Sequence, residues 1–264
     1  PPPPPIQPED GIRDCTRSLV GSEMCIRDSG RDPFTRAHQA SRELRVVTAS
    51  GRNFDIVCFD CDSTLSRVEG IDALARRAGV EEEVVPLTEA AMVGDVRLDE
   101  VYGKRLELVR PDRAAIEWLG KLYVEEIVPG AIEAINTLHA AGKDVHIISG
   151  GLHQAILPLA AELSVPSENV HAVEVIFGDN NSYADFDRKS PLALPGGKAD
   201  ICRLLGGNGK PVALIGDGAT DIEARAAGAF VVGFGGVVIR ENVKSGADVF
   251  TAGPSLTAAV DPIL

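Results

Sequence analysis

From residue 54 onward, short apolar runs alternate with longer amphipathic segments. Apolar runs at 56–59, 145–148 and 212–215 are typical of strands that are buried on both faces of a parallel sheet. Helical periodicity, with apolar residues three and four positions apart, occurs at 131–141, 152–163, 198–205 and 222–227. Shorter strands are expected at 230–232 and 249–250. This order predicts an α/β fold with a Rossmann-like, mostly parallel sheet and helices on both of its faces.

Two segments interrupt the alternation. Directly after the first strand come four amphipathic helical segments with no strand between them, at 69–77, 81–92, 99–109 and 112–125. We therefore expect a small helical cap over residues 67–126, inserted into an α/β core of residues 49–66 and 127–264. A second insertion is a short β-hairpin, predicted from apolar segments at 170–177 and 182–186 that are joined by Gly178-Asp179-Asn180-Asn181.

Residues 1–48 differ in character from the rest of the chain. Prolines 1–5, Pro8, Gly11 and Gly30 punctuate a polar stretch without a sustained apolar period, which predicts a disordered extension. Segment 11–29 also resembles translated sequencing-adapter read-through, so an artefactual origin and a genuine flexible extension both remain open.

The composition excludes some classes of partner. Of 264 residues, 26 are Lys or Arg and 39 are Asp or Glu, and the net charge of −13 argues against binding nucleic acid or an anionic membrane surface. The most apolar stretch, 226–239, contains four glycines and is shorter than the roughly 20 residues of a spanning helix. No signal peptide is evident, and an odd number of cysteines suits a reducing compartment, so we expect a cytoplasmic protein. A homodimer is compatible with the sequence.

Polar residues stand where three of the predicted strands end. Asp60 and Asp62 follow the first strand, Ser149-Gly150-Gly151 the second, and the segment from Gly216 to Asp221 a third. An Asp-x-Asp pair in this place is costly to bury unless it binds a cation or does chemistry, although a solvated Asx turn is about equally common. Because the carboxyl ends of neighbouring parallel strands meet at one edge, these residues should converge.

Oxygen-rich groups of this kind suit a hard cation, and Mg²⁺ fits best where phosphate supplies further ligands. The glycines let backbone N–H groups approach an anion, and Lys198 stands at the start of a predicted helix. Taken singly, Gly216-Asp217-Gly218 is a turn, Ser149 a helix N-cap and Lys198 a solvated cation. Together, their order along the chain favours a phosphate and metal site.

Several motifs recur in one order and resemble a known family. They are Asp60-Cys61-Asp62-Ser63-Thr64, Glu69-Gly70-Ile71-Asp72, Ala91-Met92, Arg105, Ser149-Gly150-Gly151, Gly197-Lys198, the segment 216–221 and the segment 233–236. From about Asp55 to the C-terminus the chain resembles the haloacid dehalogenase-like phosphatases, and phosphoserine phosphatases in particular. It departs from them at Val96-Arg97-Leu98, where members often have Phe near the substrate.

The resemblance implies a Mg²⁺-dependent phosphomonoester hydrolase of serine biosynthesis that works through an aspartyl-phosphate. Asp60 would be the nucleophile and a metal ligand. Asp62 would be the general acid and base, binding the metal through its backbone carbonyl. Asp217 would complete the protein ligands, and Asp221 would orient the metal site.

The same resemblance assigns residues to the substrate. Ser149, Gly150, Gly151, Lys198 and Thr220 would hold the phosphoryl oxygens. For the amino acid itself the cap would supply Glu69 for an ammonium, Arg105 for a carboxylate and Met92 as an apolar wall. The implied partner is a small phosphorylated amino acid, O-phosphoserine first. Without the resemblance, Glu69 would be a helix first-turn charge and Arg105 part of a solvated helix face.

Two alternatives remain. One is an enzyme that transfers the phosphoryl group to another alcohol, or that hydrolyses phosphohomoserine, phosphothreonine or phosphoglycolate instead of phosphoserine. In a different class, a receiver-like signalling domain also uses a strand-end Asp, an acidic metal site and a Lys. Asp62 argues against the receiver because a general base two residues after the nucleophile promotes hydrolysis, and a receiver has no helical cap.

Overall fold

The computed structural model describes Pro1 and residues 53–264. The expectation of a disordered or artefactual extension at 1–48 therefore lies outside the described residues, Pro1 apart. Within 53–264, no helix is both long enough and apolar enough to cross a membrane.

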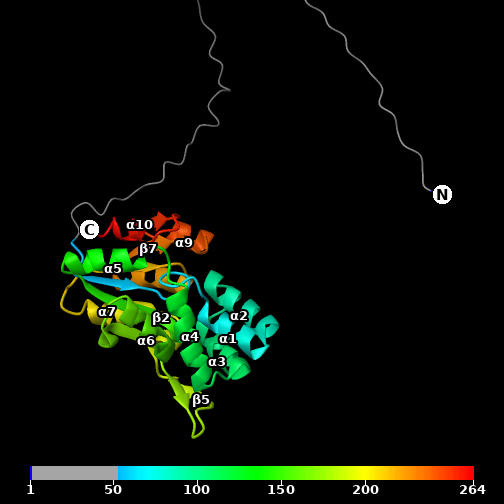
Figure 1. Cartoon of the computed structure of the whole chain (residues 1–264). Coiled ribbons are helices and arrows are strands. Elements are labelled where there is room, and N and C mark those ends of the chain that lie inside the picture. The colour runs from blue at the N-terminus through cyan, green and yellow to red at the C-terminus, as the bar shows by residue number, and fades with distance from the viewer. Residues whose placement is uncertain (2–52) are drawn as a thin grey trace, which may run out of the picture. The chain divides into compact units, whose positions relative to one another are not determined.

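Six parallel strands form the central sheet, as the apolar runs predict (Figure 1). β1 (Ile56–Phe59) lies in the interior of the sheet between β2 (Asp144–Leu152) and β6 (Val212–Gly216). The order β3-β2-β1-β6-β7-β8 is completed by β3 (Val170–Val173), β7 (Phe230–Phe234) and β8 (Val249–Thr251). The three strands that carry the predicted site residues are therefore adjacent, and their carboxyl ends open at one edge.

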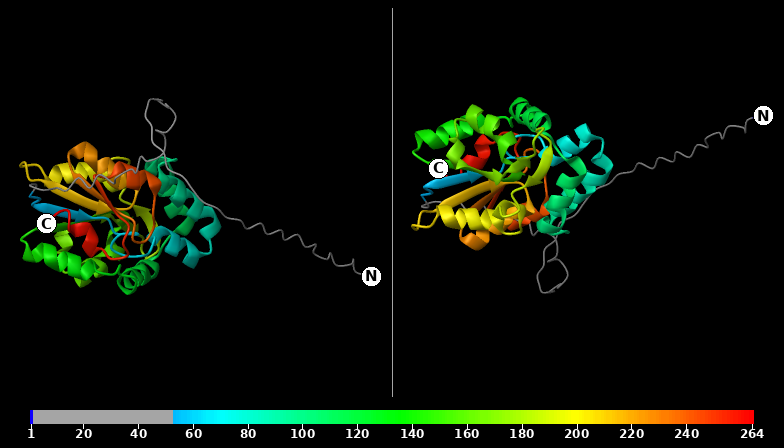
Figure 2. Two further views of the ribbon diagram at one scale, coloured as in Figure 1. Left: turned by 90° about the horizontal axis from the view of Figure 1, so that it is seen from above. Right: turned by 90° about the horizontal axis from the view of Figure 1, so that it is seen from below.

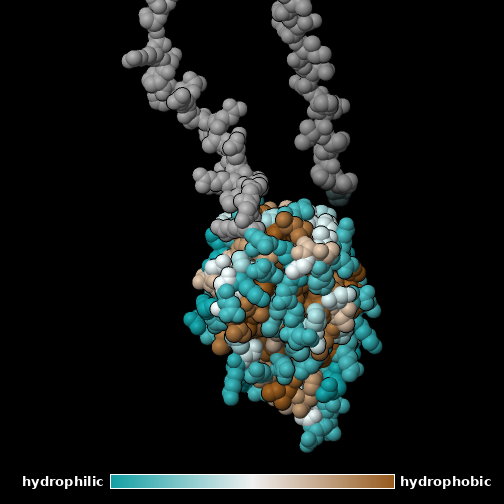
Figure 3. Space-filling model, turned by 90° about the vertical axis from the view of Figure 1, so that its left-hand side faces the viewer, coloured by the Kyte–Doolittle hydropathy of each residue, from teal (hydrophilic) through white to brown (hydrophobic). Residues whose placement is uncertain are grey.

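Helices cover both faces of the sheet, with α5 (Ala131–Ala140) on one side and α7 (Gly197–Leu205) on the other (Figure 1). The remaining core helices are α6 (His153–Glu162), α8 (Ala219–Glu223), α9 (Glu241–Gly246) and α10 (Thr257–Val260), with 3₁₀ turns at Ser167–Asn169, Pro191–Ala193 and Ala224–Ala227. Together with the sheet they confirm the predicted α/β fold class. On the face displayed in Figure 3, hydrophilic side chains predominate and hydrophobic ones form separate groups.

Four helices follow β1, where the sequence predicts the cap. They are α1 (Gly70–Ala78), α2 (Glu81–Val93), α3 (Leu98–Val109) and α4 (Arg113–Glu125). Both views of Figure 2 show the cyan and teal helices of this group to one side of the sheet. α1 and α2 end at Gly79 and Gly94, whose φ angles of 75° and 86° lie in the left-handed region that glycine adopts without strain.

α4 differs from the other three helices because it packs closely on the core helix α6. Gly120 makes this possible, since a Cβ atom there would lie 3.0 Å from Pro158 and 3.2 Å from the carbonyl oxygen of Ala155. The chain therefore leaves the inserted helices along a helix that is fixed to the core.

The predicted hairpin is present, but its first strand is shorter than expected. Residues 170–177 divide into β3, which joins the main sheet beside β2, and β4 (Val175–Phe177), which pairs antiparallel with β5 (Tyr183–Phe186). Val170 and Val173 are buried in the main sheet, so one continuous apolar run serves two sheets. Periodicity alone does not mark such a division, because the run contains no turn residue.

Candidate active site

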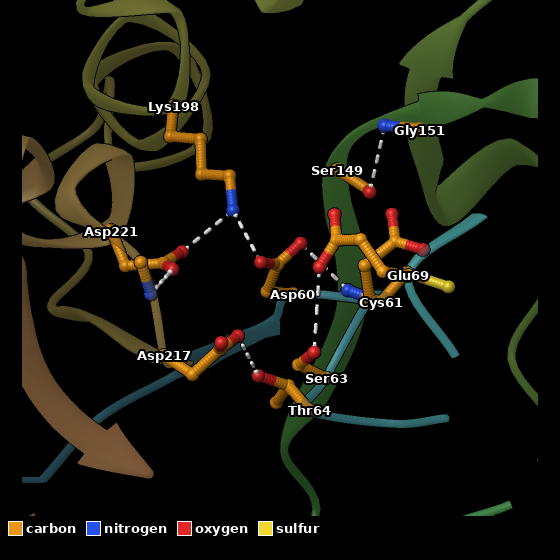
Figure 4. A network of polar contacts seen from close by, with 12 residues as sticks. Asp60, Cys61, Ser63, Thr64, Glu69, Ser149, Gly151, Lys198, Asp217 and Asp221 are labelled. Carbon is orange, nitrogen blue, oxygen red and sulfur yellow. Dashed lines mark hydrogen bonds and ion pairs between the residues drawn. The ribbon is translucent and has the colours of Figure 1, made fainter. Parts of the chain in front are cut away.

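Asp60 stands directly after β1, and its backbone N–H still pairs with the carbonyl oxygen of Ile215 at 2.9 Å. One carboxylate oxygen accepts the N–H of Cys61 at 2.7 Å, and the other lies 2.8 Å from Nζ of Lys198. Lys198, in the first turn of α7, also donates to Asp221 at 2.7 Å, so its ammonium lies between two carboxylates (Figure 4). Burial alone would lower the pKa of Lys198, but Asp221 and Asp60 outweigh it and raise the pKa above its ordinary value.

The loop after β6 brings two more carboxylates to the same place. Asp217 accepts the hydroxyl of Thr64 at 2.9 Å, and Asp221 accepts the N–H of Gly218 at 2.9 Å. Gly216 is required here, because a Cβ atom at this position would overlap the Asp221 carboxylate. Arg240 forms an ion pair with Asp217 and also donates to its backbone carbonyl at 3.1 Å.

Asp60, Asp217 and Asp221 form a buried acidic cluster with the donor set of a metal site. Each offers an oxygen within 4.8 Å of the others, and their exposed fractions are 5%, 2% and 0%. Among the residues that the structure describes, this is the only group of three or more His, Cys, Asp or Glu donors with such spacing. Only carboxylate oxygens take part, which fits a hard divalent cation, and a cation would offset the repulsion of like charges.

The carboxyl end of β2 supplies the uncharged residues of the site, Ser149, Gly150 and Gly151. β2 continues past the predicted boundary at residue 148 to Leu152, with a register shift against β3 between Ile148 and Leu152. Ser149 is buried and its hydroxyl accepts the N–H of Gly151 at 2.9 Å. The carbonyl oxygen of Gly150 accepts the Tyr102 hydroxyl at 2.8 Å, which links the α3 helix to this turn.

Asp62 lies between the strand ends and the inserted helices. Its Oδ1 accepts the N–H of Gly70 and the hydroxyl of Tyr123, each at 2.7 Å. Burial and the neighbouring charge of Asp60 raise the pKa of Asp62 to about 6, while the bonds from Tyr123 and Gly70 act in the opposite direction. A carboxyl group with a pKa near neutrality can both donate and accept a proton under ordinary conditions.

Arg105 and Glu69 lie on the cap side of the same pocket. Arg105 is 6% exposed, and its Nη1 donates to Thr88 at 3.3 Å, while Thr88 donates to Asp72 at 2.7 Å. Within the described part of the chain, its Nε has no hydrogen-bond partner. Glu69 accepts a long hydrogen bond of 3.4 Å from the Ser63 hydroxyl, and burial followed by the charge of Asp62 raises the pKa of Glu69 well above its ordinary value.

One pocket collects nearly all of the predicted residues. Its lining includes Asp60, Asp62, Glu69, Met92, Arg105, Ser149, Gly150, Gly151, Lys198 and Thr220. Asp217 and Asp221 are absent from the lining and are buried beside Asp60 in the acidic cluster. Met92 and Thr220 approach the loop after β6, where a Cβ on Gly218 would lie 3.4 Å from the Met92 sulfur and 3.7 Å from the Thr220 hydroxyl. Leu98, from the segment that departs from the family pattern, also lines the pocket.

Sequence reasoning missed several polar residues of the site, notably Thr64, Tyr102, Tyr123 and Arg240. Thr64 belongs to the quoted Asp60 motif and was within reach of that reasoning. Tyr102 and Tyr123 lie on helix faces that read as core, and Arg240 follows the apolar run 237–239 with no motif of its own. The contacts of Tyr102, Tyr123 and Arg240 join elements that are distant in the sequence, so no local sequence pattern indicates these three residues.

Comparisons with known proteins give a consistent answer. The model of a hydrolase family, described as haloacid dehalogenase-like hydrolase, matches residues 54–228. Phosphoserine phosphatase of Bos taurus is 39% identical over 208 residues, covering 78% of this chain and 91% of the relative. A solved structure described as a phospho-aspartyl intermediate analogue of phosphoserine phosphatase is 26% identical, with a TM-score of 0.70 over 81% of this chain and all of that one. A substrate-bound phosphoserine phosphatase complex matches with the same identity, TM-score and coverage.

Proposed function

The chain belongs to the haloacid dehalogenase-like hydrolases and, among them, to the phosphoserine phosphatases, and on this premise we propose that it hydrolyses O-phosphoserine to serine and phosphate through an aspartyl-phosphate on Asp60. The observation that carries the mechanism is the pair of carboxylates at the end of β1. Asp60 belongs to the acidic cluster and lies 2.8 Å from Lys198, whereas Asp62 lies outside the cluster and has a pKa of about 6. Two carboxyl groups in different environments can take different roles.

In the first step, a carboxylate oxygen of Asp60 attacks phosphorus and the bond from phosphorus to the serine oxygen breaks. The leaving alkoxide needs a proton, which Asp62 donates from its carboxyl group. In the second step, Asp62 takes a proton from water, whose oxygen attacks the phosphorus of the aspartyl-phosphate. Phosphate leaves and the Asp60 carboxylate is regenerated, so the protons of Asp62 balance over one turnover.

We assign a Mg²⁺ ion to Asp60, Asp217 and the backbone carbonyl of Asp62, with Asp221 orienting the site. When bound, the ion neutralises the phosphate dianion that faces an anionic nucleophile. Lys198 adds a fixed positive charge, since the pKa of its ammonium is raised. Ser149, Gly150, Gly151 and Thr220 lie along the same pocket and would complete the contacts to the phosphoryl oxygens.

The proposal for the amino-acid part of the substrate rests on cap groups that lack full hydrogen bonding among the described residues. Among the residues that the structure describes, the Nε–H of the buried Arg105 has no partner, which suits a carboxylate, and Glu69 suits an ammonium. The proposed substrate carries both charges, so each group would gain its missing partner. Substrates with only one of the two charges would leave a buried group unpaired.

The setting that we propose is the cytoplasm. The described cysteines, Cys58, Cys61 and Cys202, are free thiols, which is typical of a reducing compartment. With a net charge of −13, a small-molecule substrate fits better than a nucleic acid or a membrane surface.

Phosphate release from a panel of small phosphomonoesters tests the proposal. We expect phosphoserine to be hydrolysed with Mg²⁺ and not with chelator, and to exceed phosphoethanolamine and phosphoglycolate. Similar efficiency on all three would contradict the amino-acid assignment. Added homoserine should not divert the phosphoryl group, as it would in a phosphotransferase, and a long-lived phosphoprotein without turnover would instead favour a receiver-like domain.

A further inference from the structure

Asp62 is held by the two segments that connect the inserted helices to the core. The chain enters the insertion at α1, whose first residue, Gly70, donates its N–H to Asp62 Oδ1 at 2.7 Å. The chain leaves it along α4, where Tyr123 donates its hydroxyl to the same oxygen at 2.7 Å. One oxygen of the carboxyl group therefore receives two short hydrogen bonds.

The second oxygen of Asp62 has a different environment. A Cβ atom built on Gly151 would lie 3.0 Å from Asp62 Oδ2 and 3.1 Å from the Ser149 hydroxyl, so Oδ2 faces the turn that borders the phosphate pocket. An oxygen that already accepts two hydrogen bonds is the poorer site for a proton. The proton of Asp62 consequently belongs on Oδ2, the oxygen nearest to this turn.

Tyr123 is suited to a fixed donor role. Its side chain is 0% exposed, and a buried hydroxyl requires a partner, which Asp62 provides. Burial and the charge of Asp62 raise the pKa of Tyr123 well above its ordinary value, so the phenol keeps its proton. The fit is close, because a methyl group on Gly70 would overlap the Tyr123 hydroxyl.

We propose that Tyr123 is a positioning residue for the reaction: with the Gly70 N–H it anchors Oδ1 of Asp62, so that Oδ2 alone donates and accepts the proton. This inference rests on the proposed function, in which Asp62 is the general acid and base. The role of Tyr123 is to orient that carboxyl group from α4, the helix that is fixed to the core. The proton moves only between Oδ2 and the serine or water oxygen, while Tyr123 keeps its own.

The test compares two substrates that differ in their need for an acid. Serine leaves phosphoserine as an alkoxide that must be protonated, whereas acetate, a weak base, leaves acetyl phosphate without a proton. In Tyr123→Phe we expect kcat/KM for phosphoserine to fall by about 10- to 100-fold, with KM nearly unchanged, since the lost bond joins a charged group. For acetyl phosphate, kcat/KM should stay within about threefold of the wild-type value. The parameter kcat/KM covers the steps up to departure of the leaving group, and departure of acetate needs no proton from Asp62.

The chain offers a matched control in Tyr183→Phe. Tyr183 is buried, and within residues 53–264 its hydroxyl has no hydrogen-bond partner, so the same change removes no bond. Both kinetic parameters should remain at the wild-type level for both substrates. The control separates loss of the Asp62 contact from any general effect of removing a buried phenol oxygen.

A second variant disrupts the same hydrogen bond, from Tyr123 to Asp62, without changing Tyr123 itself. Gly70→Ala should displace the Tyr123 hydroxyl by steric overlap and reproduce the loss on phosphoserine. The double variant Gly70→Ala/Tyr123→Phe relieves that overlap and should be no worse than either single variant, because both changes remove one shared interaction. If Tyr123→Phe folds poorly, Gly70→Ala alone still tests the contact between Tyr123 and Asp62 on the two substrates.

The possible failures are distinguishable. If the wild type does not hydrolyse phosphoserine, the proposed function itself is wrong. If it does, a Tyr123→Phe enzyme within twofold of wild type on phosphoserine overturns the positioning role. An equal loss on phosphoserine and acetyl phosphate also overturns it, since that result indicates a structural role only, as would independent, additive losses in the double variant.

Discussion

The core half and the cap half of this pocket differ in how their charges are balanced. In the core, Lys198 contacts Asp60 and Asp221, while Arg240 pairs with Asp217. On the cap side, within residues 53–264, Arg105 Nε has no hydrogen-bond partner, and the hydrogen bond of Glu69 is a long one of 3.4 Å from Ser63. The core charges are thus organised before any substrate arrives, whereas the cap charges lack partners that a zwitterionic substrate would supply.

Under the proposed function, the core residues would carry out the chemistry and the cap residues would select the substrate. A preorganised cluster lowers the barrier for phosphoryl transfer for every substrate that reaches it. Unpaired groups instead discriminate between substrates, because a ligand that fails to pair them leaves a buried charge uncompensated. Changes in the core should therefore reduce activity on all phosphomonoesters, and changes in the cap should alter the preference among them.

The largest effect is expected from Asp60→Asn. An amide is neither a competent nucleophile nor an anionic metal ligand, so phosphate release should fall to background for every substrate. Steady phosphate release should be measured with circular dichroism and melting temperature as folding controls. Persistent activity without deamidation back to Asp would remove Asp60 from the mechanism.

Asp62→Asn comes next, with turnover of phosphoserine lowered by about 10²–10⁴-fold. Mg²⁺ binding, followed by calorimetry, should persist, because the proposed contact to the metal is a backbone carbonyl. Near-normal hydrolysis would refute the proton-transfer role while leaving the nucleophile untouched.

For the cap, Arg105→Ala should reduce kcat/KM for phosphoserine by a factor equivalent to about 2–5 kcal/mol of transition-state stabilisation. The reason is that the substrate carboxylate would lose its cationic partner in the pocket. Phosphoethanolamine lacks that carboxylate, so its poor efficiency should change little and the gap between the two substrates should narrow. Arg97→Ala is the matched control, because Arg97 lies in the same insertion, its side chain is 66% exposed, and its ion pairs in the described part of the chain are with its near neighbours Asp99 and Glu100. An equal loss on both substrates would place Arg105 in the structure of the cap and not in selection.

The smallest effect concerns stability and pH in the metal-free protein. Because the folded pKa of Asp62 is raised from 3.8 to about 6, the native state binds more protons than the unfolded state between these values, and stability falls as the pH rises through them. Asp62→Asn should remove this penalty and be more stable than wild type by about 1–3 kcal/mol at pH 8. Urea unfolding with chelator should show the advantage shrinking toward pH 4, and a constant difference would contradict the assignment.

The sequence predicted those parts of the site whose signals are local. Asp60, Ser149 and Asp217 were identifiable because each follows an apolar run that reads as a buried strand, and parallel strand ends meet at one edge. Gly79 and Gly94 likewise marked the ends of α1 and α2.

Contacts that depend on packing between distant elements were beyond that reasoning. Tyr123 and Asp62 are 61 positions apart, and their bond depends on how α4 lies against α6. The division of 170–177 between two sheets has the same origin, because either sheet could accept an apolar run. Tertiary packing, which local periodicity does not encode, decided both.

The aspartyl-phosphate mechanism is tested most directly by rapid quenching of the wild-type enzyme during turnover of ³²P-labelled phosphoserine. Proteolysis of the quenched protein should place the label on the peptide that carries Asp60, as an acyl phosphate that hydroxylamine removes. The label should appear at a rate no slower than turnover, require Mg²⁺ and be absent from Asp60→Asn. Turnover of phosphoserine without any labelled protein, or with the label on another residue, would contradict the aspartyl-phosphate mechanism on Asp60.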